Sequence, residues 1–148
     1  MSERVYFDHA ARIAPRAPYC HGNAGFVWVC DEGYIETDAQ VVIPANSLHA
    51  LHGHGVVEEL NALPQSLGPI GSGRDAVIEP SGVAEALRIL YAADSMTYGG
   101  RHDLLVERLN GVEYRIVIDN REYQRTLSRL QFLCSRATRE GRGVRLLL

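Results

Sequence analysis

The chain has 148 residues, of which 22% are charged and 46% hydrophobic, a composition typical of a soluble globular protein. No apolar run reaches the roughly 18–20 residues that a membrane span requires, and the N-terminal sequence MSERVYFDHAARI lacks the apolar core of a signal peptide. These features exclude a transmembrane protein and predict a cytoplasmic protein with one domain over residues 1–148.

The charge is unevenly distributed along the chain. All fifteen basic residues are Arg and none is Lys, a bias typical of a GC-rich genome. Residues 1–100 carry five Arg and twelve acidic residues, whereas residues 101–148 carry ten Arg and six acidic residues. The net charge of −3 therefore conceals an acidic first part and a basic last part.

Short strands are predicted near the N-terminus. FVWVC (26–30) and YIET (34–37) flank Asp31-Glu32-Gly33, which predicts a hairpin with a three-residue turn. VVI (41–43) adds a further strand before Pro44.

The middle of the chain is predicted to be mostly helical. Residues 46–62 have partial helical spacing, and Gly53 and Gly55 divide them into two short pieces. The Pro- and Gly-rich segment 64–75 is predicted to be a surface loop, followed by a short strand, DAVIE. A helix over about 82–93, capped by Ser81, is predicted to bury a stripe of four residues. These residues are Val83, Leu87, Leu90 and Tyr91.

The clearest local pattern is a hairpin around Asn110-Gly111, because a type I′ turn requires positive φ at both central residues. A two-residue turn pairs Leu109 with Val112, Arg108 with Glu113, Glu107 with Tyr114 and Leu105 with Ile116. One side of the hairpin is then an apolar core face. It consists of Leu105, Leu109, Val112, Tyr114, Ile116 and Ile118.

A long helix is predicted over about 120–140, capped by Asp119 or Asn120 and ended by Gly141 or Gly143. At about 100° per residue, its apolar residues gather on one side. These are Tyr123, Leu127, Leu130, Leu133, Cys134 and Ala137. The closing VRLLL is predicted to be a buried strand.

Together these elements predict a single α+β domain with a mostly antiparallel sheet, about three helices and a C-terminal hairpin–helix–strand. Cys20, Cys30 and Cys134 are odd in number and lack CxxC spacing, which favours reduced thiols. No cofactor motif is present, so we predict no cofactor.

Half of the histidines lie within six residues, at His49, His52 and His54. Imidazole is a common zinc ligand, so these residues with Glu58 form a candidate metal site. The spacing HxHxxxE from His52 to Glu58 resembles part of the first cupin metal motif over seven residues. The flanking glycines of that motif are missing and VVEELNAL is predicted to be helical. A solvated, turn-forming cluster without metal is therefore the favoured interpretation.

The arginines of the long helix form the more specific pattern. Five of them project within an arc of roughly 80°, together with one aromatic residue, on the side opposite the apolar stripe. The set is Arg121, Arg125, Arg129, Phe132, Arg136 and Arg139. Repulsion between like charges is offset either by acids of residues 1–100, by solvent and salt, or by a partner. We predict that this set binds a partner.

The favoured function is specific binding to another protein, without catalysis. Toxin-neutralising immunity proteins of bacteria are one class of this size and character, although no residue motif supports that class. A metal-dependent enzyme that uses His49, His52, His54 and Glu58 is one alternative. A nucleic-acid-associated regulator is the other, disfavoured because the pI is about 6.0 and no nucleic-acid module is recognised. The sequence leaves the oligomeric state open.

Overall fold

The computed structural model describes residues 3–6, 22–31, 37–95 and 99–148; of residues 3–6 and of His102 it describes the backbone only. Within these ranges the elements follow in the order β1 (Glu3–Tyr6), β2 (Gly25–Val29), β3 (Gln40–Ile43), α1 (Ala45–Gly53), α2 (Val56–Asn61), β4 (Ser66–Leu67), β5 (Asp75–Ile78), α3 (Pro80–Ser95), β6 (Arg101–Leu109), β7 (Val112–Asp119), α4 (Asn120–Glu140) and β8 (Val144–Leu147). None of the described helices is long and apolar enough to cross a membrane.

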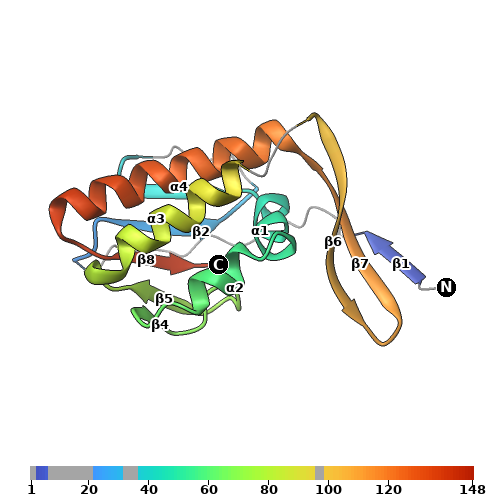
Figure 1. Ribbon diagram of the computed structural model, residues 1–148, viewed down its shortest axis with the longest axis horizontal. Helices are drawn as coiled ribbons and strands as arrows, with labels where there is room; N and C mark the ends of the chain where they lie inside the picture. The colour runs from blue at the N-terminus through green and yellow to red at the C-terminus, as the bar shows by residue number, and fades with distance from the viewer. Residues whose placement is uncertain (1–2, 7–21, 32–36, 96–98) are drawn as a thin grey trace.

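A five-stranded sheet in the order β3-β2-β8-β5-β4 forms the body of the molecule (Figure 1). β2 pairs in parallel with both β3 and β8, whereas β5 pairs antiparallel with β8 and β4. Because both edges of β2 are occupied, the predicted hairpin between 26–30 and 34–37 is wrong. Residues 32–36 themselves lie outside the described ranges.

Both faces of β2 are buried, which explains why its sequence is continuously apolar. Val27 and Val29 belong to the main core, on the face that α3 and α4 cover (Figure 1). Phe26, Trp28 and Cys30 form a second buried cluster. A parallel strand buried on both faces does not show the alternation that a half-exposed hairpin strand would show.

Helix α4 has the predicted bounds. The side chain of Asp119 accepts a hydrogen bond from the backbone N–H of Arg121 at 2.9 Å, and Gly141 ends the helix in the left-handed conformation with φ 65°. The predicted apolar stripe is confirmed, since all six of its residues are buried. A Cβ at Gly25 would collide with Leu133, so α4 packs closely against β2. Burial raises the pKa of the Cys134 thiol to about 12.

The shorter helices are largely as expected. Residues 46–62 form α1 and α2, which separate at Gly55 with φ 77°. α3 begins at Pro80 rather than after Ser81, because proline suits the first helical position. In its predicted stripe, Val83 and Leu90 are buried and Leu87 is partly buried, but Tyr91 is exposed.

The predicted turn at Asn110-Gly111 is confirmed, with φ of 52° and 77°. Leu109 pairs with Val112, and Arg108 with Glu113, as expected. The two strands of this hairpin are β6 and β7, and β1 pairs in parallel with β7. The three strands form a sheet in the order β1-β7-β6 that extends from one end of the body (Figure 1).

The expected pairing of Leu105 with Ile116 is wrong, because a β-bulge lies between Leu105 and Glu107. The bulge shifts the register by one residue, so Leu104 faces Ile116 and packs against the core. Of the predicted core face, Ile116 and Ile118 are buried, whereas Leu109 is exposed because the hairpin tip lies beyond the body.

A polar network lies on the opposite side of the hairpin. Glu113, only 8% exposed, accepts hydrogen bonds from Arg108 at 2.8 Å and from Arg115 at 3.1 Å. Arg115 also donates to Asp103 at 2.6 Å. The hydrogen bond from Arg108 is the largest cause of a lowered pKa at Glu113, although burial acts in the opposite direction.

The α+β class and the C-terminal hairpin–helix–strand are confirmed. The prediction of a mostly antiparallel sheet with about three helices is corrected: the described residues form four helices, and the sheets are mixed, since β1/β7, β2/β3 and β2/β8 are parallel while the other described pairs are antiparallel. Cys30 and Cys134 are both buried, and Cys20 lies outside the described residues.

We expect Gly111→Val to destabilise the fold by about 1–3 kcal/mol, because valine is strained at positive φ. Asn110→Gly is the control and should leave stability nearly unchanged. Urea unfolding measures both. An unchanged stability of Gly111→Val would contradict the importance of the turn.

We expect Glu113→Gln to lower the free energy of unfolding at pH 7, because it removes the carboxylate between Arg108 and Arg115. Since folding lowers this pKa, the stabilisation is complete above the unfolded value of about 4.3 and is lost as the pH falls through the lower folded value. Urea unfolding between pH 7 and pH 2 should therefore show the two proteins converging in acid. A difference that stays constant with pH would exclude this role.

Candidate functional site

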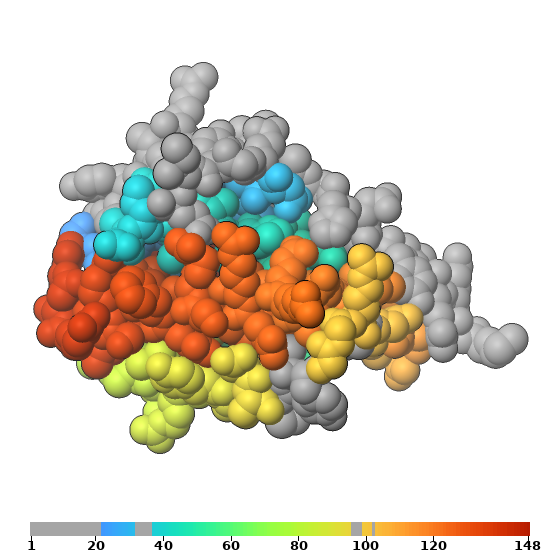
Figure 2. Space-filling model, turned by 90° about the horizontal axis from the view of Figure 1, so that it is seen from above, coloured from blue at the N-terminus to red at the C-terminus, as the bar shows by residue number. Residues whose placement is uncertain are grey.

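The arginine face of α4 consists of Arg121, Arg125, Arg129, Phe132, Arg136 and Arg139. Figure 2 shows α4 as a ridge across one side of the molecule, with α3 along one flank. Arg121, Arg125 and Arg139 are exposed, and Arg129 and Arg136 are half-buried. The Phe132 side chain is 57% exposed. Burial of the apolar stripe therefore turns this face away from the core.

Three arginines of this face have no acidic partner within the described part of the chain. No carboxylate there lies within ion-pair distance of Arg121, Arg125 or Arg139. Three arginines on the strands do have acidic partners. Arg108 binds Glu113, Arg115 binds Asp103 and Glu113, and Arg145 binds Asp75 at 2.8 Å. Arg74 and Arg101 also lack an acidic partner among the described residues, but only α4 carries several such arginines on one face.

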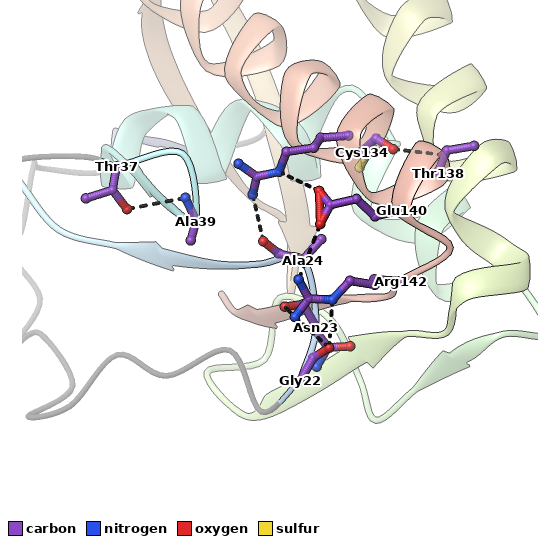
Figure 3. A network of polar contacts seen from close by, with 10 residues as sticks. Gly22, Asn23, Ala24, Thr37, Ala39, Cys134, Thr138, Glu140 and Arg142 are labelled. Carbon is purple, nitrogen blue, oxygen red and sulfur yellow. Dashed lines mark hydrogen bonds and ion pairs between the residues drawn. The ribbon is translucent and has the colours of Figure 1, made fainter.

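The C-terminal end of the face is tied to the sheet. Arg136 donates a hydrogen bond to the Ala24 carbonyl at 2.7 Å and pairs with Glu140 at 3.3 Å. Glu140 also binds Arg142, which donates to the carbonyls of Gly22 and Asn23 (Figure 3). Arg136 therefore positions the helix on β2 as well as belonging to the predicted binding set.

Two adjoining hollows lie where α4 meets β3, and Arg129 lines both of them. The first has a volume of about 240 Å³, and the second of about 150 Å³. Thr37, Asp38, Val41, Ser128 and Phe132 complete the described lining of the first, and Val42, Pro44, Glu122, Arg125 and Thr126 that of the second. The sequence does not indicate that residues 37–44 line these hollows, because no sequence pattern shows which strand α4 will border.

The histidines of the candidate metal site face different surroundings. His49, His52 and Glu58 line a hollow of about 420 Å³. The ring of His54 stacks instead on Tyr123, with 5.0 Å between ring centroids and 17° between planes. Among the described residues, no three His, Cys, Asp or Glu side chains are placed to hold one metal ion.

Tyr123 lies beneath His54 and is fully buried. Its hydroxyl has no hydrogen-bond partner among the described residues. Burial, reinforced by the charge of Asp94, raises the pKa of this phenol far above its usual value. Tyr123 therefore stabilises the fold through the packing of its ring.

Comparison with known protein families, curated proteins and solved structures gave no match.

We expect Tyr123→Phe to leave stability unchanged or to raise it by about 1 kcal/mol, because it removes a buried hydroxyl without a partner. Tyr123→Leu is the comparison and should destabilise the fold, since it removes the ring that His54 contacts. Thermal unfolding measures both. Clear destabilisation by Tyr123→Phe would show that the hydroxyl is hydrogen-bonded.

Proposed function

We propose that this protein acts by binding another protein, which presents an acidic surface to the arginine face of α4. The observation that carries the proposal is that Arg121 and Arg125, which have no acidic partner among the described residues, share one helix face with the exposed ring of Phe132. Exposed aromatic and arginine side chains are enriched in protein interfaces. Arginine also binds carboxylates through two hydrogen bonds at once.

The charges beside this face favour a protein over nucleic acid. Asp38 and Glu122 line the same hollows as Arg125 and Arg129, so a phosphate backbone there would meet carboxylates. A protein surface with mixed charges can match both signs. The net charge of −3 also opposes general attraction to a polyanion.

Within this class, we propose a cytoplasmic toxin-neutralising protein as the particular role. Such a role requires a tight, non-catalytic complex with one partner, and an acidic patch on a toxin would complement the arginine face. A toxin domain encoded in the neighbouring reading frame would support it.

A photo-crosslinking experiment tests where the partner binds. With p-benzoylphenylalanine in place of Phe132, we expect one discrete crosslinked protein in the source cells, because this side chain lies within the proposed interface. The same group in place of Leu67 is the control, since Leu67 is 52% exposed but lies on β4. Equal crosslinking from both positions, or none from position 132, would overturn the proposal.

We expect Arg125→Glu to weaken this crosslinking several-fold, and in a lysate of the source cells most strongly at low salt, because it reverses a charge at the interface. Stability should change by only about 0.5 kcal/mol, since Arg125 is exposed and pairs with no carboxylate in the described part of the chain. Arg88→Glu on α3 is the matched control and should leave crosslinking intact. The contradicting outcome is that Arg125→Glu binds heparin as strongly as the wild type and crosslinks equally well. That result would show that the arginine face binds neither an acidic protein nor nucleic acid.

A further inference from the structure

The hollow beside His49 and His52 lies between the body and the three-stranded sheet. It is formed by α1, α2, the loop before β5 and strand β6, and its volume of about 420 Å³ exceeds that of either hollow beside α4. Its described lining includes His49, His52, Glu58, Gly71, Val106 and Glu107. Because none of these elements is α4, the site is independent of the arginine face.

The β-bulge in β6 contributes two neighbouring residues to this hollow. Consecutive side chains of a regular strand point to opposite faces, yet Val106 and Glu107 both line the same hollow. The register shift falls between Leu105 and Glu107. A bulge re-aims side chains in this way, and bulges are frequent beside functional sites.

The imidazole of His52 is held in place by close packing. A Cβ at Gly71, which has φ 88°, would lie only 2.8–2.9 Å from Cε1 and Nε2 of His52. It would also lie 2.8 Å from a methyl group of Val57. Glycine at position 71 therefore allows the loop to pack directly against the His52 ring and Val57. These contacts form one wall of the hollow.

The charges of the hollow define the ligand that it suits. Its charged described residues, Glu58 and Glu107, are both acidic, and they come from two separate elements, α2 and β6. Two carboxylates can accept hydrogen bonds from one cationic donor. We propose that this hollow binds a small organic cation whose ammonium or guanidinium group donates hydrogen bonds to Glu58 and Glu107.

An organic cation fits the described residues better than a metal ion does. No three His, Cys, Asp or Glu side chains among them converge on one point, whereas structural and catalytic zinc sites use three or four protein ligands. A guanidinium or ammonium group needs only separated acceptors around it. The hollow is also larger than a bare ion requires.

The test uses simple cations and a neutral analogue of similar shape. We expect butylguanidinium and butylammonium to raise the melting temperature saturably, because a ligand that binds only the folded chain stabilises it. The NMR signals of His49 and His52 should shift along the same binding curve. Butylurea, which lacks the charge, should have no such effect. Equal effects of butylurea and butylguanidinium, or no saturable effect of either cation, would overturn the proposal.

Matched variants identify the residues involved. We expect Glu58→Gln and Glu107→Gln each to weaken cation binding about tenfold, as loss of a charge-assisted hydrogen bond predicts. Glu59→Gln makes the same change on the next residue of α2, which does not line the hollow, and should bind normally. An equal loss in Glu59→Gln would refute a specific site. Stoichiometric Zn²⁺ binding that His49→Ala abolishes, with no cation binding, would establish a metal site instead.

Discussion

Strand β8, the last strand of the chain, lies at the centre of the five-stranded sheet, between β2 and β5. It pairs in parallel with β2 and antiparallel with β5, and the amide of Gly73 donates to the terminal Leu148 carbonyl at 2.6 Å. The two halves of the sheet are therefore joined only when the C-terminal residues are in place. Helix α4 must bring the chain to this position across the sheet, and its 21 residues span about 32 Å at 1.5 Å per residue.

This constraint also sets the orientation of the arginine face. With Leu133 against Gly25 and Arg136 bonded to the Ala24 carbonyl, α4 cannot rotate about its axis without losing both contacts. The adjoining flank of the helix then borders β3 and the hollows that Arg129 lines. Arg108, Arg115 and Arg145 on the strands pair with carboxylates, whereas Arg121, Arg125 and Arg139 of this face lie on the surface.

Helix α1 connects the body with the three-stranded sheet. Asn46 donates to the Val117 carbonyl at 3.1 Å, and Thr126 of α4 bonds to Ser47 at 2.9 Å. Gly53 approaches Leu104 so closely that a Cβ would lie 2.7 Å from it. The same helix carries His49 and His52 into the hollow that Glu107 completes. The contacts that join the two sheets therefore also build the proposed cation site, separately from the protein-binding face.

Local signals in the sequence determined the Asn110-Gly111 turn, the caps of α4 and the two sides of that helix, because each depends on residues close together in the chain. The three consecutive apolar residues Leu104–Val106 break the alternation of a regular strand and were the available sign of the bulge. Only the tertiary structure decided that β2 pairs in parallel with β3 and β8, and that Glu107 joins His49 and His52 while His54 stacks on Tyr123. Such choices depend on which distant segments meet, and strand partners are selected by packing over the whole sheet rather than by the residues of one strand.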